Sequence, residues 1–196
     1  MSHVTLQGTL SFPKLFKAEQ IMGQGDPKYQ AVLILTPESL EVYKKEMLSC
    51  MSENFKSGQE KKPSFRWPLR KCDDSAHYQG DPRFAGRMFV NLKSDEKNKP
   101  KILNQQREEI IDPSVIYSGC EVATVANVYH YDNKFGAGMG TGFNVLMKVS
   151  DGERLGGGSA PDIDAMLGDI VTTPDSGGSA TAAPAGDMPQ MPDFLS

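Results

Sequence analysis

The sequence predicts a mainly β fold, a small barrel or curved sheet, with one early α-helix and a disordered acidic C-terminal tail. Strand-like apolar patterns recur through the first 150 residues, a single segment has helical spacing, and Gly, Ser, Ala, Thr and Pro dominate from residue 172. The 196 residues suffice for one domain and a tail. We expect the domain to span residues 1–158 and the tail residues 159–196.

The N-terminal third predicts two strands followed by a helix. Apolar and polar residues alternate from Val4 to Ser11, and residues 29–35 form an almost continuous β-favouring run. Thr36 is a suitable N-cap and Pro37 suits the first helical position. Apolar residues then follow at helical spacing to about residue 56, so the stripe of this helix should face the core: Leu40, Tyr43, Met47, Met51 and Phe55.

Three further strands are expected after a long loop. Residues 57–86 have neither helical nor strand periodicity, and a loop of this length within a domain is usually functional or disordered. We interpret it as a binding loop. Residues 87–93 alternate strictly, placing Arg87, Phe89, Asn91 and Lys93 on one face. Residues 120–131 and 142–149 are expected to pair through a hairpin turn at 132–134.

Charge is segregated along the chain. Residues 1–150 contain 20 Lys and Arg and 17 Asp and Glu, a charge of +3, whereas residues 151–196 contain one Arg and eight acids, a charge of −7. Residues 61–107 alone contain 12 basic and 5 acidic side chains, a charge of +7. The net charge of −4 therefore does not exclude a polyanionic partner.

Cations and aromatic rings alternate in this basic region. Single-stranded nucleic acid requires cations for its phosphates and flat rings for its unpaired bases. We predict that Trp67 and Phe89 stack on bases, with Tyr78, Phe84 and Tyr129 as further candidates; the alternative, that some of these rings fill the barrel, stays open. The full predicted set of nucleic-acid-binding residues, below called the predicted DNA-binding set because of the family resemblance given at the end of this section, is Lys61, Lys62, Phe65, Arg66, Trp67, Arg70, Lys71, Tyr78, Arg83, Phe84, Arg87, Phe89, Asn91, Lys93 and Tyr129.

Catalytic, metal and cofactor sites are not predicted. The three histidines are scattered, and Cys72 with His77 lacks a second pair of ligands at zinc spacing. The glycines at 136, 138, 140 and 142 lack the context of a phosphate-binding loop and favour a glycine-rich hairpin arm or bulged strand. Two alternatives remain: a nuclease using Asp73, Asp74 or Asp81 with Mg²⁺, and a structural or scaffold protein.

Export and membrane residence are not expected. No apolar run approaches the ~20 residues of a membrane span, and residues 1–3 do not begin a secretion signal. The three cysteines are odd in number and widely spaced, which favours reduced thiols in a cytosol.

The order and spacing of several short motifs resemble a family of bacteriophage single-stranded-DNA-binding proteins. The motifs are Gly-Arg-Met-Phe-Val-Asn at 86–91, Pro100, Ile-Asp-Pro at 111–113, Ile-Tyr-Ser-Gly-Cys at 116–120, Tyr-His-Tyr at 129–131 and Gly-Glu-Arg-Leu-Gly-Gly at 152–157. The resemblance implies an OB-fold with a basic, aromatic cleft. It further implies sequence-independent binding in phage DNA replication, recombination or repair, in the cytoplasm of the infected bacterial host.

The same resemblance implies a role for the tail. In this family a disordered acidic C-terminus competes for the cleft and docks on replication enzymes such as a polymerase, helicase or primase. The corresponding residues here would be Asp187, Asp193 and Phe194. The last residues, 192–196, depart from the pattern because they contain few acids and because two residues follow Phe194. A homodimer or a cooperative assembly on DNA stays open.

Overall fold

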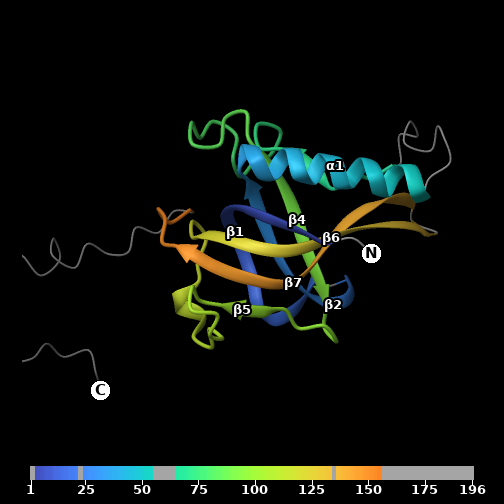
Figure 1. The fold of residues 1–196 in the computed structure, drawn as a ribbon. Coiled ribbons are helices and arrows are strands. Elements are labelled where there is room, and N and C mark those ends of the chain that lie inside the picture. The colour runs from blue at the N-terminus through green and yellow to red at the C-terminus, as the bar shows by residue number, and fades with distance from the viewer. Residues whose placement is uncertain (1–2, 22–23, 55–64, 134–135, 156–196) are drawn as a thin grey trace, which may run out of the picture. The chain divides into compact units, whose positions relative to one another are not determined.

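The computed structural model describes residues 3–21, 24–54, 65–133 and 136–155 (Figure 1). These residues belong to one compact unit, Met1–Gly157. Its elements are β1 (His3–Ile21), β2 (Gln24–Leu35), α1 (Pro37–Asn54), β3 (Leu69–Lys71), β4 (Met88–Asp95), β5 (Lys101–Leu103), a 3-10 helix (Pro113–Val115), β6 (Glu121–Asn133) and β7 (Gly136–Ser150). The predicted mainly β fold with one early α-helix is confirmed.

Five strands close into a barrel. Antiparallel pairing joins β4 to β2, β2 to β1, β1 to β6 and β6 to β7. The circuit closes where β7 pairs in parallel with β4, with Leu92 opposite Thr141 and Lys93 opposite Gly142. A closed five-stranded barrel of this kind is typical of the OB-fold. The short strands β3 and β5 extend the edges of β4 and β7.

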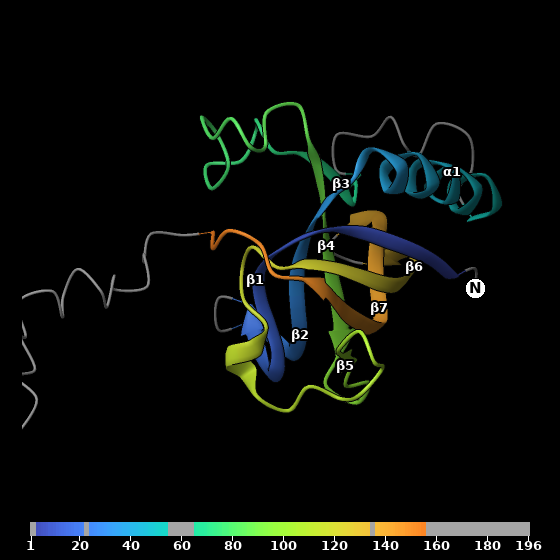
Figure 2. The ribbon, with the colours of Figure 1, turned by 60° about the vertical axis from the view of Figure 1, so that its left-hand side comes forward.

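Helix α1 lies across one end of the barrel (Figures 1 and 2). The Thr36 hydroxyl accepts a hydrogen bond from the Ser39 amide at 3.3 Å, as an N-cap should. Ser39 in turn accepts from the Gln7 amide on β1 at 2.7 Å. The apolar stripe of α1 packs on the core as predicted, except that Phe55 lies outside the described residues: Leu40, Tyr43, Met47 and Met51.

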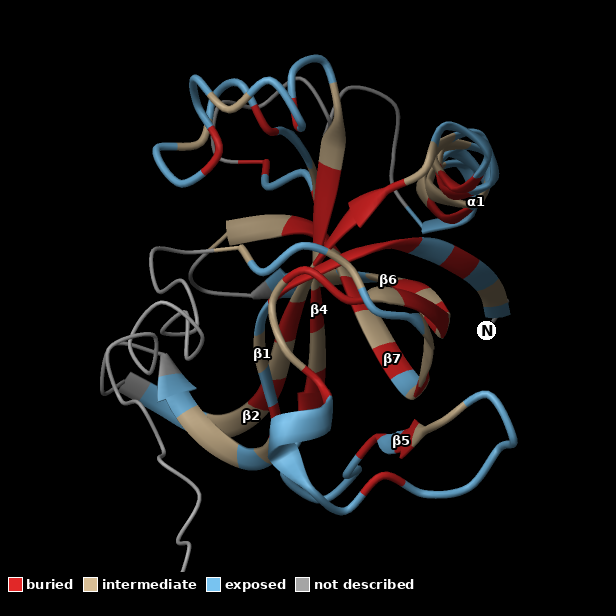
Figure 3. Cartoon of the chain, turned by 90° about the vertical axis from the view of Figure 1, so that its left-hand side faces the viewer, coloured by how far each residue is buried: buried red, intermediate tan, exposed pale blue. Residues whose placement is uncertain are grey.

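The main core fills the barrel, where the buried positions gather in Figure 3. A second cluster forms where residues 72–84 pack against β2 and β4, and it consists of Ile34, Cys72, Tyr78, Phe84 and Phe89. All three cysteines are free and buried. No helix among the described residues is long and apolar enough to span a membrane.

The N-terminal strands differ from the prediction in length and regularity. β1 continues to Ile21, well past the alternating segment. After Ser11 its pairing with β2 shifts register three times. Such bulges bend a strand and break its two-residue alternation, so sequence periodicity cannot reveal them. β3 and β5, each three residues long, were not predicted because they are too short to show a pattern.

Candidate nucleic-acid interface

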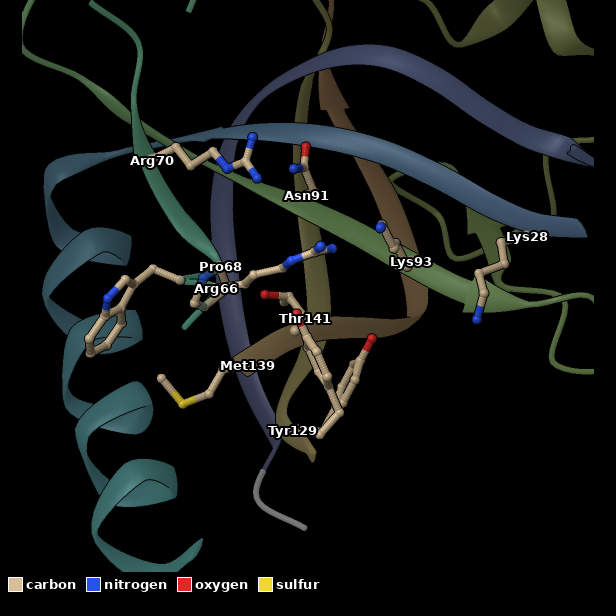
Figure 4. A pocket seen from close by; sticks show the side chains of 12 residues that line it. Lys28, Arg66, Pro68, Arg70, Asn91, Lys93, Tyr129, Met139 and Thr141 are labelled. Carbon is tan, nitrogen blue, oxygen red and sulfur yellow. The ribbon is translucent and has the colours of Figure 1, made fainter. Parts of the chain in front are cut away.

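A cavity of about 580 Å³ lies on the outer face of the barrel, where β4, β6 and β7 meet the segment that precedes β3. Its lining combines cationic, aromatic and small side chains: Lys28, Arg66, Trp67, Pro68, Arg70, Asn91, Lys93, Tyr129, Tyr131, Met139, Gly140 and Thr141. Figure 4 shows Arg66 extending toward Lys93, with Tyr129 and Thr141 below them. We call this cavity the groove.

Strand alternation positions the β4 residues of the groove. Val90 and Leu92 point into the barrel and are fully buried, so Asn91 and Lys93 face outward, as predicted. Opposite residues of an antiparallel pair share a face. Lys28 on β2 lies opposite Asp95 and donates a hydrogen bond to its carboxylate at 2.6 Å, which raises the pKa of Lys28.

The segment before β3 is fixed to β7 by its backbone. The Arg66 amide donates to the Ala137 carbonyl at 3.1 Å, and the Met139 amide donates to the Arg66 carbonyl at 3.0 Å. These bonds set Arg66 and its neighbour Trp67 beside β7. The Trp67 ring packs edge-on against Phe65 with centroids 4.8 Å apart, yet the residue stays 39% exposed at the groove.

Glycines on β7 leave room for the tyrosine side chains of β6. Tyr129 is paired with Gly140, and Tyr131 with Gly138. A Cβ atom added at Gly140 would lie 2.5 Å from the Tyr129 Cζ, and one added at Gly138 would lie 2.7 Å from the Tyr131 hydroxyl. Real Cβ atoms essentially never approach other atoms so closely. The Tyr129 ring therefore occupies the space that a side chain at Gly140 would take, whereas at Gly138 the space is shared by the Tyr131 hydroxyl and the Arg66 carbonyl oxygen, 2.6 Å from the added Cβ. The predicted glycine-rich hairpin strand therefore forms a seat for two rings.

Helix α1 reaches β7 at the groove through one hydroxyl pair. Tyr43 of α1 is completely buried and its hydroxyl is within 2.5 Å of the Thr141 hydroxyl, which lines the groove. Burial raises the pKa of Tyr43 well above its usual range, so the phenol stays neutral. A neutral hydrogen-bonded pair under the floor of the groove adds no negative charge against an anion.

The cations of the groove repel one another. Burial foremost, and then the positive charges of Lys28, Arg70 and Arg66, lower the pKa of Lys93. When nearby like charges disfavour the charged form of a group, an anion that binds beside it offsets the repulsion and stabilises the charged form. The arrangement is therefore suited to a chain of phosphates, with the flat rings available to unpaired bases.

Comparison with known proteins identifies the family. Residues 1–168 match the family described as "Enterobacter phage Enc34, ssDNA-binding protein". The chain belongs to this family. A relative from Acyrthosiphon pisum secondary endosymbiont phage 1, "Putative protein p50", is 27% identical over 174 residues, covering 79% of this chain and 86% of that protein.

Two solved structures share the fold. The single-stranded DNA-binding protein of bacteriophage Enc34, solved in complex with ssDNA, is 23% identical with a TM-score of 0.63, covering 79% of this chain and 89% of that one. The single-stranded DNA-binding protein gp2.5 of bacteriophage T7 is 16% identical with a TM-score of 0.59, covering 81% of this chain and 97% of that one. The resemblance predicted from the sequence motifs is confirmed.

The structure brings part of the predicted DNA-binding set together. Six predicted residues line the groove: Arg66, Trp67, Arg70, Asn91, Lys93 and Tyr129. Lys71 lines an adjoining cavity, which shares Arg70 with the groove. Lys61 and Lys62 lie outside the described residues, as do Asp187, Asp193 and Phe194 of the tail.

Four rings of the predicted set are buried, which corrects the expectation that Tyr78, Phe84 and Phe89 stack on bases and the inclusion of Phe65 among the DNA-binding residues. Phe65 belongs to the main core, while Tyr78, Phe84 and Phe89 pack together in the second cluster. Phe89 does share the outward face with Asn91, but Tyr78 covers it, with ring centroids 5.4 Å apart, and leaves it 7% exposed. A covered ring has no free face for a base.

Two predicted phosphate contacts are engaged elsewhere. Arg83 forms ion pairs with Asp81 at 2.6 Å and with Glu153 at 3.0 Å. Arg87 donates to the backbone carbonyls of Ile34, at 3.4 Å, and Leu35, at 3.2 Å. Neither arginine lines the groove.

Sequence reasoning missed half of the groove. Lys28 was missed because it is a single cation far from the basic region, which only the β2–β4 pairing brings close. The remaining residues were missed as site residues, although the alternation of Tyr129 and Tyr131 against the alternating glycines is a signal that could have found the seat: Pro68, Tyr131, Met139, Gly140 and Thr141.

Proposed function

We propose that this protein binds single-stranded DNA without sequence preference during phage DNA replication, recombination or repair, in the cytoplasm of the infected bacterial host. The observation that carries the proposal is the convergence of four cations and three flat rings on one groove: Lys28, Arg66, Arg70 and Lys93 with Trp67, Tyr129 and Tyr131. The family's description and the relative solved with ssDNA support the same ligand.

Each half of this set has a defined role. The cations neutralise phosphates and release counterions, which supplies affinity for any sequence. The rings offer π-faces, and each stacked base contributes about 1–3 kcal/mol regardless of its identity. Paired bases in a duplex are already stacked on one another, so the rings favour a single strand. Binding by these two means requires no bond breaking and no cofactor.

A gel shift with single-stranded and duplex oligonucleotides, with and without Mg²⁺, tests the proposal. We expect a shifted single-stranded complex, weaker binding of duplex, and intact DNA in the presence of Mg²⁺. Cleavage would instead support the nuclease. Asp81, one of its candidate carboxylates, is held by Arg83, and Asp73 accepts from the Gly86 amide at 3.1 Å. Absence of any complex would leave the scaffold protein as the better explanation.

Salt dependence distinguishes groove cations from other cations. For a single strand, the slope of log affinity against log salt is about −0.7 per phosphate contact. We expect Arg66→Ala to make the slope shallower by about 0.7, because it removes one groove cation. Arg83→Ala is the matched control, since Arg83 already pairs with two carboxylates, and it should leave the slope unchanged. Equal changes in both variants would refute the assignment of phosphate contacts to the groove.

Lys93 gives binding a dependence on pH. Its pKa is lowered in the free protein, and a phosphate beside it would raise that pKa again. Affinity should therefore be level at pH values below the free-state pKa and fall as the pH rises past it. Oligonucleotide titrations from about pH 7 to about pH 10 measure this for the native chain and for Lys93→Arg, whose guanidinium stays charged. The arginine variant should give the flatter profile; identical profiles would exclude a phosphate at Lys93.

We also propose that the acidic tail docks on replication enzymes through Asp187, Asp193 and Phe194. Residues 159–196 contain six Asp residues and no Lys or Arg, a charge of −6, opposite in sign to the groove cations. This proposal rests on the sequence pattern and on the family resemblance.

A further inference from the structure

Phe12 has an exposed aromatic ring and lies on the outer face of the barrel that also carries the groove. It is 49% exposed although it belongs to a strand of the barrel. Its φ of +46° is in the left-handed region, which is costly for a bulky residue. The register shift between Ser11 and Lys14 creates a bulge here, and bulges re-aim side chains.

Surrounding contacts hold Phe12 in this conformation. Its amide donates to the Ser118 hydroxyl at 2.9 Å. Its ring meets the His77 ring edge-on, with centroids 4.9 Å apart, and the Tyr78 ring at 6.4 Å. A strained backbone that presents a fixed apolar ring to solvent costs stability without forming core, and strain of this kind concentrates at ligand sites.

Phe12 lines a cavity of about 250 Å³ that adjoins the groove. Asn91 and Lys93 line both cavities, so the two lie next to each other along β4. Lys14 and Gln30 complete the polar lining of the second cavity. Strand register gives the same result, because Lys14 lies opposite Gln30, which lies opposite Lys93. One row of side chains thus crosses β1, β2 and β4 from the groove toward Phe12.

We propose that Phe12 is a second base-stacking platform, and that the single strand runs from Trp67 and Tyr129 across Asn91 and Lys93 to Phe12. This inference rests on the proposed function and adds to it a direction across the strands and a longer site. From β4 to β1 is two strand spacings, about 10 Å, which corresponds to roughly two or three stacked nucleotides. Lys14 supplies a cation at this end; its exposed ion pair with Glu19 is weak enough to yield to a phosphate.

The test compares variants of Phe12 in the full chain on oligo(dT) of about four nucleotides, short enough to stay within the groove, and of about twelve nucleotides, lengths within the range of an OB-fold site. Phe12→Gly is the principal variant because glycine tolerates the positive φ, so loss of the ring is separated from backbone strain. Phe12→Leu is the matched control that keeps the strain and the apolar character without a flat ring. Phe12→Tyr restores the ring.

We expect Phe12→Gly and Phe12→Leu to weaken binding of the longer oligonucleotide about fivefold to tenfold and to leave the shorter one, held in the groove, unchanged. Phe12→Tyr should bind as the native chain does, and Trp67→Ala should weaken both lengths. Unchanged binding of the longer oligonucleotide by both Phe12 variants, while Trp67→Ala still weakens it, overturns the platform but not the proposed function. The proposal for Phe12 is also overturned if the Phe12 variants lose affinity equally for both oligonucleotide lengths, or if they change only the self-association of the protein. If the native chain binds neither oligonucleotide, the proposed function itself fails.

Discussion

Trp67→Ala should weaken binding of single-stranded DNA about tenfold. Trp67 is held beside the groove by the backbone bonds of Arg66, and its exposed face is open to a base. Loss of one stacked base costs about 1–3 kcal/mol, and 1.4 kcal/mol is a factor of ten. Because the chain has a single Trp, its fluorescence reports on this contact alone. We expect oligonucleotide to quench it in the native chain.

Two variants make this result specific. Trp67→Phe keeps a flat ring and should recover most of the affinity. Phe89→Leu tests a ring that the sequence pattern also assigned to stacking but that the structure buries beneath Tyr78. It should lose about 1 kcal/mol of stability without loss of affinity in the folded protein. Native affinity in Trp67→Ala, together with weakened binding in Phe89→Leu, would move the site from the groove to the second cluster.

Gly140→Val should also weaken binding about tenfold, although it removes no contact group. The valine side chain would occupy the space of the Tyr129 ring, whose Cζ lies 2.5 Å from the position of an added Cβ. The ring must leave its seat and can no longer present the same face to a base. Valine favours strands, so the hairpin itself should persist. Circular dichroism and thermal melting check the fold, and fluorescence titration measures the affinity.

A double-mutant cycle separates this effect from general damage. Tyr129→Ala removes the ring, after which Gly140→Val has nothing left to displace. The loss from Gly140→Val in the Tyr129→Ala background should therefore be small, and the two single losses should not add. Additive losses would show that glycine at this position serves the strand itself rather than the tyrosine.

The faces of regular elements could be predicted from the sequence. The alternation of residues 87–93 placed Asn91 and Lys93 outward, and the helical spacing after Thr36 placed Tyr43 in the core, both correctly. The periodicity of a single β-strand or helix of the protein specifies which way a side chain points. This periodicity does not specify which other segment of the chain covers the side chain. Phe89 points outward as predicted and is nevertheless buried, because the chain from Cys72 to Phe84 folds over it.

The groove as a whole could not be predicted, because it depends on pairing between distant segments. Lys28 becomes part of the groove through the pairing of β2 with β4. The seat of Tyr129 depends on the register that places Gly140 opposite Tyr129. Arg83 shows the converse. It belongs to the basic region by sequence, but the structure places it outside the groove, where it pairs with Asp81 and Glu153. Local charge density predicts the class of ligand better than it predicts the contacts.

Photo-crosslinking to a 5-iodouracil-substituted single strand, followed by mass spectrometry of the peptides, locates the rings that touch bases. If cations and flat rings share one groove for an unpaired strand, the adducts should map to Trp67, Tyr129 or Tyr131, with Phe12 at the far end of longer strands. Arg66→Ala should reduce their yield. Adducts confined to residues remote from both cavities, such as Tyr117, would contradict the account.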